Sequence, residues 1–158
     1  MNLRSTITIA IACFICSSIC EDAGAQSGTL DNTFGEDGVF LYSIPGFNTT
    51  TATGIELQPD GKYVVSGKAS SQVPDISKFI AVRVNPDGKI DSSFGTDGYA
   101  ANNTYGRSFA HDLGLQQDGK ILITGQDFDN VAVTENIGVM RLNADGSLDT
   151  TSTQRRVL

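Results

Sequence analysis

Tryptophan is absent from this 158-residue chain, histidine occurs once, and cysteine occurs only at Cys13, Cys16 and Cys20. The chain after residue 20 therefore holds no disulfide, and its stability has to come from core packing. One histidine without nearby cysteines also leaves no spacing typical of a zinc site. The net charge is −7 and the basic residues are scattered, which argues against nucleic acid as a partner.

Residues 1–25 differ in composition from the rest of the chain. Arg4 precedes an apolar run at residues 7–20, and the small-x-small sequence Ala23-Gly24-Ala25 follows. This order is typical of a secretory signal peptide, here cleaved before Gln26. The apolar run is shorter than the roughly 20 residues of a membrane span. We therefore expect a secreted, periplasmic or cell-surface protein with no stable membrane span after cleavage; a retained signal anchor is the alternative.

The remaining sequence repeats with a period of 58–60 residues. LDNTFGEDGVF at 30–40 matches IDSSFGTDGYA at 90–100. LQPDGKYVVSG at 57–67 matches LQQDGKILITG at 115–125. Such self-similarity is the signature of an array of structural units that stack on their neighbours.

The matches predict a first repeat at 26–89, a second at 90–147 and the start of a third at 148–158. In the third repeat the pattern stops, because Ser152 stands where the second repeat has Phe94. We expect the chain to be a fragment of a longer protein, through truncation or a reading-frame break near Thr150. Assembly of several chains into one ring is the alternative, and a gene product without an independent function is a further one.

Each repeat carries four strand-like stretches and no helical period. In the first repeat these stretches lie at 38–44, 51–58, 62–69 and 78–85, with the alternation or the continuous apolar run that strands show. Four antiparallel strands in about 60 residues make one blade of a β-propeller. The sequence thus predicts an all-β fold of two four-stranded antiparallel blades. Because blades bury their faces only against neighbours, two blades would leave apolar faces available for self-association.

These motifs also resemble a known family. LDNTFGEDG, LQPDGKYVVSG and RVNPDGKIDSSFGTDG, with LQQDGKILITG and RLNADGSLD in the second copy, are similar to the delta-60 repeat, a β-propeller-type repeat of bacterial secreted proteins. The resemblance covers nearly all of residues 30–149. It implies an extracellular or cell-surface protein, and the family carries no general catalytic motif.

An Asp-Gly pair recurs in QPDGK, NPDGK, QQDGK and NADGS, and each of these four is either a turn or part of a cation-binding loop. In QPDGK, at 58–62, the order Pro-Asp-Gly suits a type I turn that closes with a glycine bulge. A calcium site would have to draw on Asn85, Asp87, Asp91 and Asp97, but the EF-hand order fails there. We predict turns, with no metal and no cofactor.

Arg83 and Arg141 occupy matching positions among apolar residues, and an arginine in such a place needs a partner. The predicted partners are Asp37 and Asp97. We interpret the pairs as a structural connection between a strand and a loop; a channel of arginines that binds anions is the alternative. The equivalent Phe34 and Phe94 are expected to pack under the blade edge.

His111 is the one histidine, and it has no counterpart at the matching Thr53. A Ser–His pair with Ser108 is therefore a weak hypothesis, and we predict no catalytic residues and no enzymatic activity. The longest loops, at 70–78 and 127–135, differ between the repeats, which favours recognition by loops on a constant frame. The predicted function is binding of an extracellular protein or glycan. A fragment of a propeller hydrolase or lyase is the alternative.

Overall fold

The computed structural model describes residues 28–72, 75–101, 107–129 and 133–151. The predicted signal peptide at 1–25 and the end of the chain from residue 152 lie outside these residues. Within them the fold is all-β, and the all-β prediction is confirmed. No helix in this part of the chain is long and apolar enough to span a membrane.

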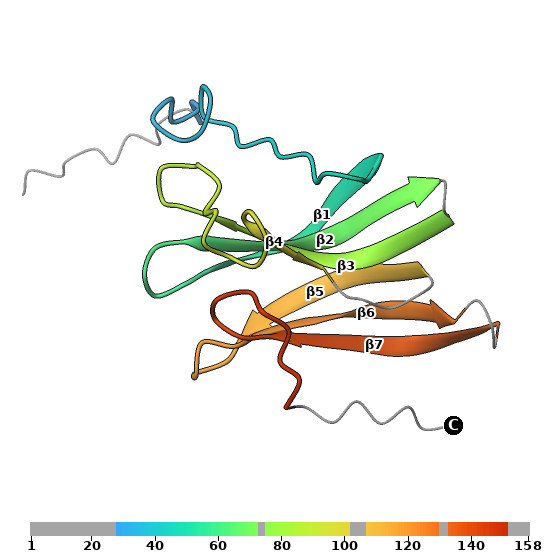
Figure 1. Ribbon diagram of the computed structural model, residues 1–158. Helices are drawn as coiled ribbons and strands as arrows, with labels where there is room; N and C mark the ends of the chain where they lie inside the picture. The colour runs from blue at the N-terminus through green and yellow to red at the C-terminus, as the bar shows by residue number, and fades with distance from the viewer. Residues whose placement is uncertain (1–27, 73–74, 102–106, 130–132, 152–158) are drawn as a thin grey trace, which may run out of the picture.

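Seven strands form two antiparallel groups, which we call blade 1 and blade 2 (Figure 1). Blade 1 comprises β1 (Thr49–Leu57), β2 (Tyr63–Gln72), β3 (Asp75–Val84) and β4 (Tyr99–Ala101). Blade 2 comprises β5 (Arg107–Leu115), β6 (Ile121–Asp129) and β7 (Thr134–Leu142). A single parallel bridge, Ser77 with Arg107, connects β3 to β5.

Three of the four strand predictions for the first repeat are confirmed to within a few residues, as β1, β2 and β3. The predicted strand at 38–44 is wrong, because its counterpart pairs with the third strand of the preceding repeat, and the described residues contain no repeat before the first. Its counterpart in the second repeat is β4, which pairs with β3 of the first repeat, with Tyr99 opposite Val82. The fourth strand of a blade therefore comes from the next repeat along the chain.

The apolar side chains gather in two clusters, one on each face of blade 1. The first cluster lies between the blades and includes Val64, Phe79, Ala81, Phe94, Ala110, Leu113, Ile121, Ile123, Met140 and Leu142. The second lies on the opposite face of blade 1 and joins Ile80, Val82 and Val84 to Ile44, Phe40 and Tyr42. The segment that failed to form a strand thus packs over this face, at the top of Figure 1.

Candidate functional site

The Asp-Gly pairs of QPDGK, NPDGK, QQDGK and NADGS all form the predicted turns. In the first, the Gly61 N–H donates to the Gln58 carbonyl at 2.9 Å, and the Gln58 N–H donates to the Lys62 carbonyl at 2.7 Å. Gly61 has a φ of 83°, a left-handed value that glycine adopts without steric cost. The Asp60 carboxylate accepts the Lys62 backbone N–H at 3.2 Å, so it serves the turn. Among the described residues, no three His, Cys, Asp or Glu side chains are placed to hold a metal ion.

The turns that follow β3 and β7 have a second contact. Gly35 N–H donates to the Asp87 carbonyl at 2.9 Å, and Gly95 N–H donates to the Asp145 carbonyl at 2.8 Å. Each Phe-Gly pair therefore rests on the last Asp-Gly turn of its own repeat. Phe94 is fully buried there, as predicted for packing under the blade edge.

Arg83 makes the connection between the blades. Its Nε donates to Asp91 Oδ2 at 2.7 Å, and its Nη1 donates to the Ala144 carbonyl in the last turn of the second repeat, also at 2.7 Å. The guanidinium lies 4.7 Å from the centre of the Phe94 ring. In blade 2, Arg141 Nε donates to Asp149 Oδ2 at 2.7 Å. The structural connection is confirmed.

The predicted partners of the two arginines, Asp37 and Asp97, are wrong. Both aspartates sit at a φ of 50° in tight turns. The acceptor is instead Asp91, which is held beside the strand because its N–H donates to the Arg83 carbonyl at 2.9 Å. Lys62 Nζ adds a second cation at 2.8 Å from Asp91 Oδ2.

These contacts lower the pKa of both acidic partners well below the usual range. Burial by itself raises the pKa of Asp91, but hydrogen bonds from Lys62 and Ser93 and the charge of Arg83 outweigh it. For Asp149 the hydrogen bond from Thr151 comes first, followed by that from Lys120. Both carboxylates are therefore ionised throughout the neutral range.

The stability of the fold should consequently decrease at acidic pH. Because the folded state lowers both pKa values, this stabilisation is present above the unfolded-state pKa of about 3.9 and is lost as the pH falls below it. We expect a level melting temperature between about pH 7 and pH 5, and a fall below about pH 4. Circular dichroism melts across a pH series measure this. The Asp91→Asn, Asp149→Asn double variant should have a lower melting temperature than the parent chain at pH 7, and its melting temperature should fall less on acidification. A fall in melting temperature equal to that of the parent chain would contradict the assignment.

The Ser–His hypothesis finds no support in the geometry. His111 is exposed on β5. Ser108 is buried, and its Oγ donates to Asp127 Oδ1 at 2.7 Å. The structure does not bring these two residues together as a hydrogen-bonded nucleophile and base.

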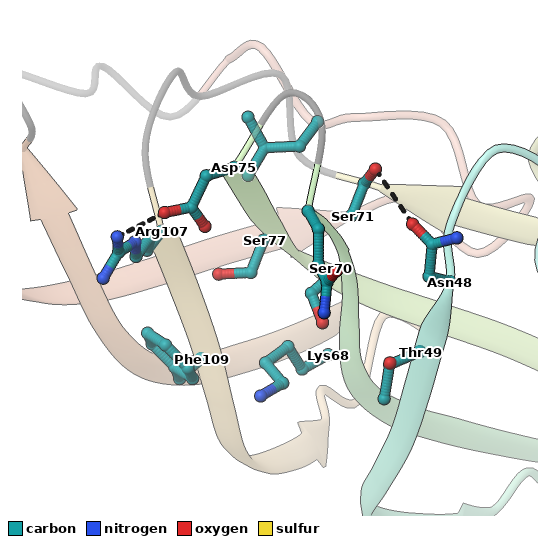
Figure 2. A pocket seen from close by; sticks show the side chains of 11 residues that line it. Asn48, Thr49, Lys68, Ser70, Ser71, Asp75, Ser77, Arg107 and Phe109 are labelled. Atoms are coloured by element: carbon teal, nitrogen blue, oxygen red, sulfur yellow. Dashed lines mark hydrogen bonds and ion pairs between the residues drawn. The ribbon is translucent and has the colours of Figure 1, made fainter.

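A polar pocket of about 380 Å³ opens where the β2–β3 end of blade 1 meets the start of β5. We call it the Ser77 pocket. Figure 2 shows its lining, which consists mainly of polar side chains from both blades. The lining residues are Asn48, Thr49, Lys68, Ser70, Ser71, Gln72, Asp75, Ile76, Ser77, Arg107 and Phe109.

The polar groups of this pocket differ in how they are paired. Ser77 is 3% exposed, and no described residue lies within hydrogen-bond reach of its Oγ. Lys68 Nζ stands 4.7 Å from the centre of the Phe109 ring, and no described carboxylate forms an ion pair with it. Arg107, by contrast, is paired with Asp75, as the dashed line in Figure 2 marks. The pocket therefore presents the buried Ser77 hydroxyl and the Lys68 ammonium group without a polar partner among the described residues.

The predicted loops at 70–78 and 127–135 are wrong for most of their described residues, because β2 extends to Gln72, β3 begins at Asp75, β6 extends to Asp129 and β7 begins at Thr134. Residues 70–72 and 75–77 line the pocket from these strand ends, whereas none of the described residues in 127–135 does so. Sequence reasoning missed Lys68 and Phe109, which lie on strands. A signal for both existed, because the repeat frame aligns Lys68 with Gln126 and Phe109 with Thr51. Residues that change within a repeated frame are candidates for a specific role.

Comparison with known proteins identifies the type of repeat but gives no function. Residues 58–94 and 116–151 match the model of a family described as a β-propeller domain of unknown function (DUF5122). Each match contains one Arg–Asp pair, Arg83 with Asp91 in the first and Arg141 with Asp149 in the second. No curated protein and no solved structure gave a significant match. The two stretches are β-propeller-type repeats.

Proposed function

We propose that these two β-propeller-type repeats are of the delta-60 type and form a non-enzymatic binding module of an exported bacterial protein. The module would take a hydroxyl-rich ligand, a glycan, in the Ser77 pocket. The observation that carries this proposal is the buried Ser77 hydroxyl, which no described residue satisfies. A buried hydroxyl without a partner costs about 1–3 kcal/mol, and a ligand hydroxyl would remove that cost.

The surroundings of Ser77 suit a sugar better than an apolar ligand. Sugar hydroxyls both donate and accept, and the pocket offers donors in Lys68 and Ser77 and the Asn48 amide as donor and acceptor. Asn48 Oδ1 already accepts from Ser71 Oγ at 3.2 Å, which orients the amide. Phe109 adds a patch of apolar surface at one side of the pocket, and a few placed polar groups beside an aromatic ring are typical of ligand sites.

Hydrolysis is not part of the proposal. Glycosidases use a pair of carboxyl groups that flank the scissile bond. Among the described residues of the Ser77 pocket, Asp75 is the one carboxylate, and it is paired with Arg107. The alternative of a propeller hydrolase or lyase therefore lacks a second acid at this site.

Titration calorimetry with a panel of neutral and acidic oligosaccharides tests the proposal. At least one sugar should bind, and Ser77→Ala and Lys68→Ala should each weaken that binding about tenfold, because each removes a group that faces the ligand. Lys78→Ala is the matched control, since Lys78 follows Ser77 on β3 but does not line the pocket. Binding of peptides alone, or sugar binding that Ser77→Ala leaves unchanged, would contradict the glycan assignment.

A further inference from the structure

The Ser77 pocket lies on the face of blade 1 that meets blade 2. In the pairing of β2 with β3, Ser70 lies opposite Ser77. Two residues further along, Lys68 lies opposite Phe79, which belongs to the apolar cluster between the blades. Because strand side chains alternate between the two faces of a sheet, Lys68, Ser70 and Ser77 share the face that carries Phe79. The pocket is therefore a polar continuation of the interface between the blades.

Lys68 supplies the uncompensated charge of this pocket. Three charged side chains line it, those of Lys68, Asp75 and Arg107, and two positive charges less one negative charge leave a net charge of +1. Arg107 and Asp75 neutralise each other in an ion pair, in which their side chains are 48% and 62% exposed. The charge that remains is that of Lys68, which forms no ion pair with a described carboxylate.

The sign of this charge is opposite to that of the whole chain. The chain has 18 acidic and 11 basic residues, and its net charge is −7. The summed field of an acidic chain repels anions, so the binding of an anionic ligand requires a local cation. Among the described residues that line the pocket, Lys68 meets this requirement.

An aromatic ring on the other blade holds the Lys68 ammonium group in place. Its Nζ lies 4.7 Å from the centre of the Phe109 ring, and Phe109 belongs to β5. Lys68 is half-buried. The face of an aromatic ring attracts a cation but accepts no conventional hydrogen bond, so the three N–H donors of the ammonium group remain for a ligand. Phe109 thus positions the charge without satisfying its donors.

The Ser77 hydroxyl is a second donor beside the ammonium group. Ser77 is the diagonal neighbour of Lys68 across β2 and β3, a relation that separates two residues by about 7–8 Å. Figure 2 shows the polar ends of both side chains directed toward the side of the pocket where Phe109 and Arg107 lie. A carboxylate has two acceptor oxygens and can accept from an ammonium group and a hydroxyl at once.

We propose that the ligand of the Ser77 pocket is an acidic glycan, and that a uronate carboxylate of this glycan binds between Lys68 Nζ and Ser77 Oγ. This inference rests on the glycan assignment proposed above and names the chemical group that the site selects. A carboxylate suits the site better than a phosphate monoester, because its single negative charge matches one uncompensated cation, whereas the monoester carries a charge of about −1.5 to −2. The neutral side chains of Asn48, Thr49 and Ser70 remain for the sugar hydroxyls.

Titration calorimetry of the full chain with matched pairs of sugars tests the inference. Each pair consists of an oligomer of a hexuronic acid and the oligomer of the corresponding neutral hexose, in the gluco, galacto and manno series. In at least one pair the uronate should bind about tenfold more tightly, since hydrogen bonds to a charged group are stronger than those between neutral groups. Neutral hexoses that bind as tightly as the uronates would overturn the inference and leave the glycan proposal standing. Binding of no sugar at all would overturn both.

Variants of two lysines separate a local effect from an effect of net charge. Lys68→Gln removes the charge and keeps a side chain of similar length, so the uronate should bind no more tightly than the neutral hexose. Lys68→Arg should keep the preference. Lys78→Gln is the matched control, because it changes the net charge equally at a residue of β3 that does not line the pocket. A preference that Lys78→Gln reduces as much as Lys68→Gln does would contradict the inference.

Phe109 has a positioning role that the same measurement reports. Phe109→Ala should reduce the ratio of the uronate affinity to the hexose affinity, because the ammonium group loses the ring that holds it. Phe109→Tyr keeps an aromatic face and should restore the ratio. A merely structural role would lower the melting temperature of Phe109→Ala and leave the ratio unchanged, and that outcome would refute the positioning.

Discussion

Arg83→Ala should lower the free energy of unfolding by about 3 kcal/mol and the melting temperature by about 10 °C. The change removes the Nε donor that lies 2.7 Å from Asp91, which stays buried with Lys62 as its remaining cation. It also leaves the Ala144 carbonyl without its bond from the other blade and takes the guanidinium away from the Phe94 ring. Thermal and urea unfolding followed by circular dichroism measure the loss.

Arg141→Ala is the matched control for this prediction. Arg141 makes the same 2.7 Å bond to an aspartate, but its side chain is 28% exposed where that of Arg83 is 10% exposed. A more exposed guanidinium contributes less to its ion pair, and we expect the free energy of unfolding to fall by clearly less than it does for Arg83→Ala. Equal losses for the two variants would show that the bond from Arg83 to the second repeat adds nothing to stability.

Gly88→Ala should destabilise the chain by about 3 kcal/mol, through overpacking and through strain at a left-handed position. A Cβ at Gly88 would lie 2.2 Å from the Gly35 nitrogen and 2.9 Å from the Phe34 ring. The Phe-Gly pair would have to leave its place on the turn, and the bond from Gly35 N–H to the Asp87 carbonyl would be lost with it. The same unfolding measurements report the effect.

Gly46→Ala separates the two causes. Gly46 has a φ of 83°, similar to the 76° of Gly88, but a Cβ there would meet no atom within 4 Å. The Gly46→Ala change should therefore lower the free energy of unfolding only by the conformational strain, about 1 kcal/mol. If Gly46→Ala and Gly88→Ala cost the same, the close approach of the Phe-Gly pair to the turn carries no stability.

Much of the local structure could be predicted from the residues alone. Pro59, Asp60 and Gly61 prescribe a turn because they supply, in order, a fixed φ, a carboxylate that accepts a backbone N–H two residues later, and a positive φ. Alternation and apolar runs located β1, β2 and β3 because the side-chain period of a strand is two. These features depend on residues that are close in sequence, so they can be predicted without knowing the tertiary structure.

The candidate site could be predicted only in outline. The variable stretch at 70–78 pointed to the end of blade 1 where the pocket lies, although its described residues belong to β2 and β3. Lys68 and Phe109 lie on different strands and are 41 residues apart in sequence. The partner of Arg83 was missed for a related reason. Asp91 and Asp97 are both near in sequence, and the path of the chain after β3 decides which carboxylate reaches the guanidinium.

The amino-acid sequence by itself determined the repeat frame, the all-β class and the Asp-Gly turns, since each follows from short-range backbone geometry and side-chain period. Tertiary structure alone decided that the fourth strand of blade 1 comes from the second repeat, that Arg83 pairs with Asp91, and that the Ser77 pocket forms between the blades. The physical reason is that a strand pairs with the edge that the folded chain brings beside it, and a buried charge pairs with whichever partner the packed chain brings within reach. Residues 38–44 illustrate this, because they match β4 in sequence yet form no strand where the described residues contain no preceding repeat beside them.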